Sequence, residues 1–143
     1  METPIILEPS KGVPDQLSEV LQSQPATEDE KNAGRILRLH RDFLNGGIEQ
    51  AISNLAAIDE VASTYCAAYQ AIGLDEAFLI WKKAISLAAA SQISGEQWDA
   101  LDDEYDRLIY GNGANDAIEW TIVRYIQCNP KLFEQALIKS NNH

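Results

Sequence analysis

The chain has 143 residues, a length that supports one hydrophobic core and not two. Hydrophobic residues make up 45% of it and charged residues 23%, which excludes a largely disordered chain. The 22 acidic and 11 basic residues leave a net charge of -11, which disfavours direct binding to nucleic acid or to an anionic membrane. The charge suits attraction of a basic protein, although many acidic proteins use it only to remain dispersed.

The sequence predicts helices throughout. Residues 1–12 contain two prolines and no hydrophobic period, and they predict a flexible N-terminal arm. Over residues 13–143, apolar residues recur at three- and four-residue spacing, whereas no segment alternates like a strand between hairpin turns. We therefore expect an all-α fold: a single-domain multi-helix bundle of about seven or eight helices.

The first two helices have clear start signals. Pro14 suits a first helical position, and this helix is expected to end near Pro25. Thr27 and Glu30 then have the spacing of a capping box, with Glu28 and Asp29 in a favourable first turn.

The second helix is expected to stop at Asn45-Gly46-Gly47, because asparagine and glycine accept the left-handed conformation that ends helices. A short helix follows from Ile48, and Gln50 and Asn54 are placed to brace the turn. Asn45, Gly46, Gly47 and Gln50 are therefore interpreted as a structural turn. A phosphate-binding loop is disfavoured, because no strand precedes the glycines and no Lys-Ser or Lys-Thr pair follows them.

Further start signals occur at Asp59-Glu60, Asp75, Asn115 or Asp116, and Asn129-Pro130, with stops at Gly73 and Gly111-Asn112-Gly113. The tryptophans Trp81, Trp98 and Trp120 fall at core-like positions of these helices.

The helix predicted over residues 96–110 carries the strongest binding signal. Apolar residues Trp98, Leu101, Tyr105 and Leu108 define its inner face, so the acidic residues are expected to point outward. Side chains three or four residues apart lie ~5–6 Å from one another, a spacing comparable to that of phosphates along a nucleic-acid strand. The alternative is an ordinary solvated helix face. The candidate partner-binding acids are Glu96, Asp99, Asp102, Asp103 and Asp106, joined by Glu28 and Asp29.

Catalytic and metal-binding patterns are weak. Asp102-Asp103-x-x-Asp106 matches the DDxxD motif of terpenoid synthases, but the second metal motif and the larger chain of those enzymes are missing. His40 lies on or beside an apolar stripe, where a structural histidine is commoner than a catalytic one. Cys66 and Cys128 are far apart and are interpreted as small buried apolar residues; a disulfide between them stays open. We expect no catalytic site, no metal and no cofactor.

Three blocks of the sequence resemble the conserved pattern of a bacterial DNA-mimic-protein-like family of small acidic helical domains. The first block is Leu39, Asn45-Gly46-Gly47-Ile48-x-Gln50 and Asn54. The second is Ala68-Tyr69-Gln70-Ala71-Ile72-Gly73 with Ala77 and Lys83-Ala84, and the third is Leu101-Asp102-Asp103-x-Tyr105 with Tyr125-Ile126 and Asn129-Pro130-x-x-Phe133. The resemblance covers roughly residues 33–134. It implies an all-α fold and, in one member, mimicry of DNA by surface carboxylates that block a repressor.

Together these features predict a non-catalytic acidic protein that inhibits or regulates a basic nucleic-acid-binding partner by charge mimicry. Two alternatives stay open: an immunity protein that neutralises a cognate toxin, and a structural oligomer. An enzyme would require a deep polar pocket where His40 meets carboxylates. The sequence starts with acidic residues and has no apolar run of about 20 residues, so we expect a cytoplasmic protein. Its oligomeric state stays open between monomer and dimer.

Overall fold

The computed structural model describes residues 5–55, 60–91, 93–111, 113 and 115–141. All secondary structure in these residues is helical, which confirms the predicted fold class. None of the described helices is long and apolar enough to cross a membrane. In chain order the elements are η1 (Pro9–Lys11), α1 (Asp15–Ser23), α2 (Glu28–Ser53), α3 (Glu60–Ala71), α4 (Asp75–Ala89), α5 (Gly95–Tyr110), α6 (Ala117–Cys128), η2 (Pro130–Phe133) and α7 (Glu134–Asn141).

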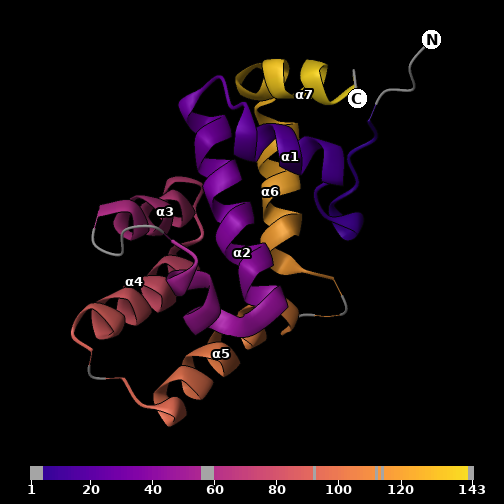
Figure 1. The fold of residues 1–143 in the computed structure, drawn as a ribbon. Helices are drawn as coiled ribbons and strands as arrows, with labels where there is room; N and C mark the ends of the chain where they lie inside the picture. Colours follow the sequence, from indigo (N-terminus) through magenta and orange to yellow (C-terminus); the bar gives the residue numbers. More distant parts are fainter. Residues whose placement is uncertain (1–4, 56–59, 92, 112, 114, 142–143) are drawn as a thin grey trace.

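α2 is the axis around which the other helices are arranged (Figure 1). It contacts α1 and α3 most extensively, and α4, α5 and α6 also touch it. Its start is the predicted one: the side chain of Thr27 accepts a hydrogen bond from the backbone N–H of Glu30 at 3.1 Å. α1 and α7 lie at one end of α2, and α5 lies at the other end (Figure 1).

The predicted stop at Asn45-Gly46-Gly47 is instead a kink inside α2. Helical structure continues on both sides of Gly47, whose φ of 85° and ψ of 177° interrupt it. This positive φ is strained for any residue with a Cβ, so glycine permits the chain to bend here without ending the helix. The side chain of Gln50 packs against Gly46 and donates to Asn54 Oδ1 at 2.9 Å.

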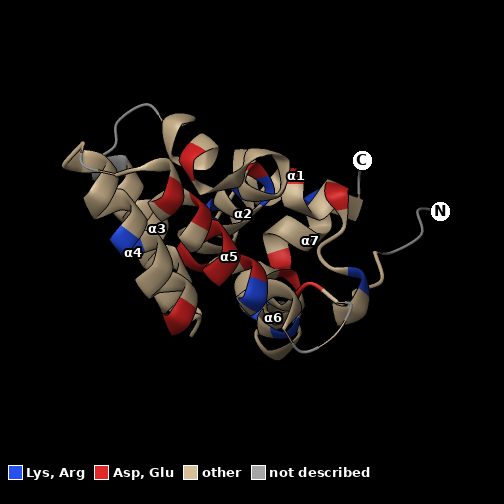
Figure 2. Cartoon of the chain, turned by 90° about the horizontal axis from the view of Figure 1, so that it is seen from below, with Lys and Arg blue, Asp and Glu red and all other residues tan. Residues whose placement is uncertain are grey.

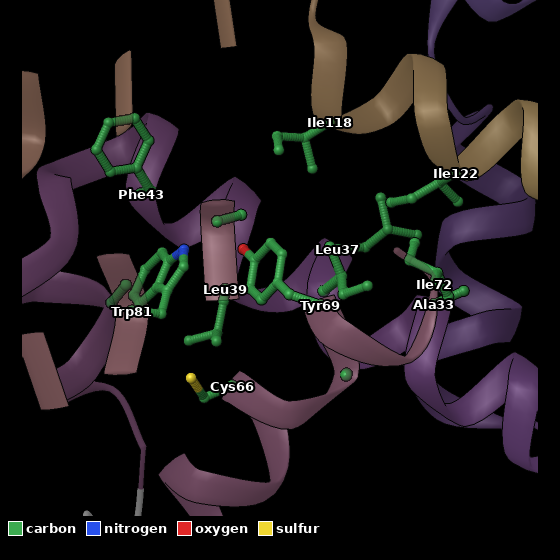
Figure 3. Packing of buried hydrophobic residues seen from close by; sticks show 14 of the residues in the cluster. Ala33, Leu37, Leu39, Phe43, Cys66, Tyr69, Ile72, Trp81, Ile118 and Ile122 are labelled. Carbon is green, nitrogen blue, oxygen red and sulfur yellow. The ribbon is translucent and has the colours of Figure 1, made fainter. Parts of the chain in front are cut away.

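Every α-helix contributes buried side chains to one continuous hydrophobic core. Figure 3 shows part of this core. Trp81 and Tyr69 are fully buried at its centre and stack with their ring centroids 6.0 Å apart. Two expectations were wrong. Trp120 is 40% exposed because it lies on the outer face of α6, and Cys128 is exposed because α6 ends there. Both cysteines are free thiols.

The N-terminal segment packs on the domain from residue 5 onward. The backbone N–H of Ile5 donates to Asn141 Oδ1 at 2.8 Å, and Gln127 donates to the carbonyl oxygen of Leu7 at 3.0 Å. The side chains of Ile5 and Leu7 rest against the core. The arm therefore has fixed partners in this conformation, and residues 1–4 of the predicted arm lie outside the described part.

Candidate partner-binding surface

α5 begins at a complete capping box. The Ser94 side chain accepts from the backbone N–H of Gln97 at 3.2 Å, and the Gln97 side chain accepts from the backbone N–H of Ser94 at 2.8 Å. These two bonds satisfy donors that a helix start otherwise leaves unpaired. The cap fixes the start of α5 one residue before the predicted boundary.

The inner face of α5 is set by Leu101, Tyr105 and Ile109, all of which are buried. Trp98 is half-buried beside them. Leu108, predicted to face inward, is only half-buried, and its place in the core is taken by Ile109. This face anchors α5 against α2, α4 and α6, so the opposite face of the helix is left to solvent.

Four carboxylates follow one another along that solvent face, and we call them the outer acidic row: Glu96, Asp99, Asp103 and Asp106. Their three-, four- and three-residue steps place them on one line of the helix, and all four are exposed. At a rise of 1.5 Å per residue, the row is about 15 Å long, or about 5 Å per charge. One strand of DNA carries a phosphate about every 3.4 Å of helix axis, so the two charge spacings are of the same order.

No lysine or arginine among the described residues forms an ion pair with the outer acidic row. Among the described residues, the lysines and arginines that form ion pairs are Lys11, Lys31, Arg35 and Arg41. None of their carboxylate partners lies on α5. Arg107, the one cation of α5, turns its Nε toward the backbone carbonyl of Asp103 at 3.3 Å. Figure 2 shows acidic residues concentrated on α5, with few basic residues beside them.

Asp102 departs from the expected outward orientation. Its carboxylate is half-buried, and Oδ1 accepts a hydrogen bond from the backbone N–H of Ile48 at 2.9 Å, immediately after the kink. A Cβ on Gly47 would lie 2.9 Å from Oδ2 of the same carboxylate. Asp102 therefore joins α5 to the kink of α2, and it connects two sequence blocks that each belong to the family-like pattern.

The two predicted acids at the start of α2 have partners within the chain. Glu28 pairs with Arg35 at 3.2 Å and more loosely with Lys31 at 3.9 Å. Asp29 Oδ1 accepts from the hydroxyl of Tyr125 at 2.8 Å, a hydrogen bond that raises the pKa of Tyr125. The structure does not bring Glu28 and Asp29 together with the outer acidic row, because α5 lies at the opposite end of α2.

A buried polar chain was not visible in the sequence. The Tyr69 and Tyr105 hydroxyls lie 2.9 Å apart, and Tyr105 lies 2.8 Å from His40 Nδ1. His40 Nε2 lies 2.5 Å from Asp116 Oδ2. Each hydroxyl, imidazole and carboxylate group in this chain therefore has a hydrogen-bond partner inside the fold. The only sequence signals were a histidine on an apolar stripe and an aspartate at a helix start.

Burial and hydrogen bonding set the protonation states in this chain. Burial raises the pKa of both Tyr69 and Tyr105, so their hydroxyls remain protonated donors. Burial alone would raise the pKa of Asp116, but the hydrogen bond and charge of His40 and the backbone N–H groups of α6 outweigh it and lower that pKa. The ring of His40 has no exposed surface, so a substrate cannot reach it in this conformation.

His40, Asp116 and Glu119 each offer a potential metal ligand, and the three atoms lie within 4.8 Å of one another. All three groups already have partners. Asp116 Oδ1 caps α6 by accepting from Ile118 and Glu119, while Glu119 Oε1 accepts from the Val13 N–H at 2.9 Å and pairs with Arg41 at 3.2 Å. We therefore interpret the cluster as structural, since it ties α2, α6 and the N-terminal segment together.

The thiol of Cys66 is also suited to packing rather than chemistry. It is 3% exposed, and burial raises its pKa to about 11, against a smaller lowering by the charge of Lys82. A thiol with this pKa is almost entirely protonated at neutral pH, and only the thiolate is nucleophilic.

The chain was compared with known protein families, curated proteins and solved structures. Residues 24–129 match the model of the family described as DMP19-like protein. The chain belongs to this family. This match confirms the family suspected from the sequence. DMP19-like proteins are a DNA-mimic family and are generally not enzymes. The match runs from the residues before α2 to the residue after α6 and includes all of α5. No curated protein and no solved structure matches the chain.

Proposed function

We propose that this DMP19-like chain binds a basic nucleic-acid-binding protein through the outer acidic row and inhibits or regulates it by occupying the surface that holds DNA. The single observation behind this proposal is the row itself: four exposed carboxylates along α5 without a lysine or arginine partner in the described residues. An ordinary solvated face of mixed charge would offer its own counter-ions.

The electrostatics favour capture of a cationic groove. Like charges three and four residues apart destabilise a helix slightly, so the row lowers the stability of free α5. A partner whose lysines and arginines normally contact phosphates relieves that repulsion on binding. The net charge of -11 adds long-range attraction, which raises the association rate with a basic protein and falls with ionic strength.

The test is competition for DNA. A panel of basic DNA-binding proteins from the native cell is bound to labelled duplex DNA, and the chain is added at 50 and at 200 mM salt. A true partner releases DNA when the chain is added, with apparent affinity at least tenfold weaker at the higher salt. The variant E96Q/D99N/D103N/D106N is expected to lose this competition.

A matched control separates the row from net charge. The variant E8Q/D15N/E19Q/E134Q removes the same number of exposed carboxylates from the N-terminal segment, α1 and α7, and leaves α5 unchanged. Its apparent affinity in the competition assay is expected to stay within about threefold of that of the parent chain. Equal loss in both variants would reject the row as the binding site. A partner that binds without releasing DNA would favour the immunity alternative.

A further inference from the structure

Three cations gather in one pocket on the first half of α2. Lys31, Arg35 and Arg38 are spaced four and three residues apart and therefore share a helix face. Together with residues of α1 and α3 they line a pocket of about 260 Å³. Collecting like charges is unfavourable in a folded chain, and it is unexpected in one that has twice as many acids as bases.

The pocket is shaped by a close crossing of α1 and α2. A Cβ on Gly34 would lie 2.1 Å from the carbonyl oxygen of Leu21, so only glycine allows the two helices to approach this closely. Besides the three cations, the pocket is lined by Leu21, Gln22, Pro25, Gly34 and Tyr65. The Arg38 guanidinium lies 5.9 Å from the centroid of the Tyr65 ring, which holds it beside the pocket.

The charge within the pocket is positive although the protein is acidic. Glu28 is the carboxylate paired with these cations: it contacts Arg35 at 3.2 Å and Lys31 at 3.9 Å, and its side chain is 67% exposed. Arg38 makes no ion pair with a described residue; its Nη2 donates to the Asn54 carbonyl at 3.4 Å. Three cations less one carboxylate leave a local charge of about +2.

We propose that this pocket binds a phosphate-class dianion, either inorganic phosphate or a phosphate monoester. Such a group carries about -1.5 to -2 charges at pH 7 and offers several acceptor oxygens, which match two guanidinium groups and one ammonium. The pocket is smaller than a typical site for a larger organic ligand of about 300–1,000 Å³. A nucleic-acid strand is disfavoured, because the remainder of the chain repels an extended polyanion.

The site is independent of the outer acidic row. Lys31 lies in the first turns of α2, whereas α5 packs around the kink at the other end (Figure 1). Binding at the pocket therefore does not depend on the proposed mimicry of DNA, and either conclusion can fail without the other.

The test is calorimetric titration of the full chain with sodium phosphate, with ionic strength held constant by sodium chloride. R38Q is expected to weaken phosphate binding by about 10- to 100-fold, the effect of losing a hydrogen bond to a charged group. R124Q is the matched control, because Arg124 is exposed on α6 and contacts Gln127. E28Q, which removes the internal counter-ion, is expected to bind phosphate more tightly than the parent chain.

A second titration with a phosphoserine peptide of otherwise neutral sequence distinguishes the source of the phosphate group. Tighter binding of the peptide identifies a phosphoryl group on a larger molecule, and tighter binding of phosphate identifies the free ion; both outcomes support the site. The proposal is overturned if neither probe binds at millimolar concentration, or if R38Q and R124Q weaken binding equally while circular dichroism shows both variants folded.

Discussion

The carboxylates of this protein fall into two groups that differ in partners and not in chemistry. Those of the outer acidic row end in solvent, and none of them forms an ion pair with a cation in the described part of the chain. Glu30, Asp102, Asp116 and Glu119 instead turn inward, and each accepts hydrogen bonds from backbone N–H groups. The contrast teaches that the inner carboxylates hold elements together, whereas the outer row is left available for another molecule.

The largest effect is expected at Glu30, which has no exposed surface. Its two oxygens accept from the N–H groups of Ala26 at 2.7 Å and Ala136 at 3.0 Å. E30A leaves the buried N–H of Ala136 and the partly buried N–H of Ala26 unpaired, and it is expected to lower the free energy of unfolding by about 4 kcal/mol, measured by urea denaturation. E19A, which removes an exposed acid of α1, is the control. Similar losses in the two variants would break the distinction between inner and outer acids.

Asp116 tests the structural role of an inner carboxylate through the pH dependence of the unfolding free energy. D116A is expected to lower the free energy of unfolding by about 3 kcal/mol, because α6 loses its cap and His40 loses its charged acceptor. The pKa of Asp116 is lower in the folded than in the unfolded chain, so its contribution is present above about pH 4 and is lost as pH falls further. The unfolding free energy of D116N should therefore depend less steeply on pH below about 4. A D116N curve parallel to that of the parent chain would contradict this.

Gly47 and Asp102 test whether an inner carboxylate joins α5 to the kink. G47A is expected to lower the free energy of unfolding by about 2 kcal/mol. The φ of Gly47 is 85°, and the new Cβ would crowd the Asp102 carboxylate. D102A removes that carboxylate and the hydrogen bond to Ile48. Because the two residues touch, the double variant should lose less than the sum of the single losses. Additive losses would show that the contact carries no energy.

The smallest effect on stability is expected from the outer row. E96Q/D99N/D103N/D106N should change the free energy of unfolding by less than about 0.5 kcal/mol, and relief of like-charge repulsion favours a small gain. Urea denaturation at low and at high salt measures it. A loss of several kcal/mol would mean that the row is structural, and its effect on binding could then not be assigned to contact with a partner.

Local signals were sufficient to predict the helices and several of their ends. The Thr27 cap and the inner face of α5 around Leu101 and Tyr105 both follow from short-range spacing. The stop at Gly47 was predicted as a helix end because a sequence shows that glycine permits a turn. It does not show that Asp102, 54 residues after Ile48, will accept a hydrogen bond from the N–H of Ile48 where the helix continues.

The same limit applies to the candidate site. Periodicity placed five aspartates and glutamates on the outside of α5, and four are there; the fifth, Asp102, borders the inner face and is covered by a neighbouring helix. The bonds of His40 to Tyr105 and Asp116 span 65 and 76 residues, and such pairings leave no local pattern. Trp120 was misplaced because aromatic character alone favours burial.

The capping box at Ser94 and the bond from Asp102 to Ile48 fasten α5 at its start and near its middle. The backbone that carries the outer carboxylates is therefore already ordered before any partner arrives. Association then requires only side-chain ordering rather than folding of a segment, so less entropy is lost than in coupled folding and binding. A rigid rod of charge also holds its spacing, which lets the chain discriminate between basic proteins by the geometry of their grooves and not by their charge alone.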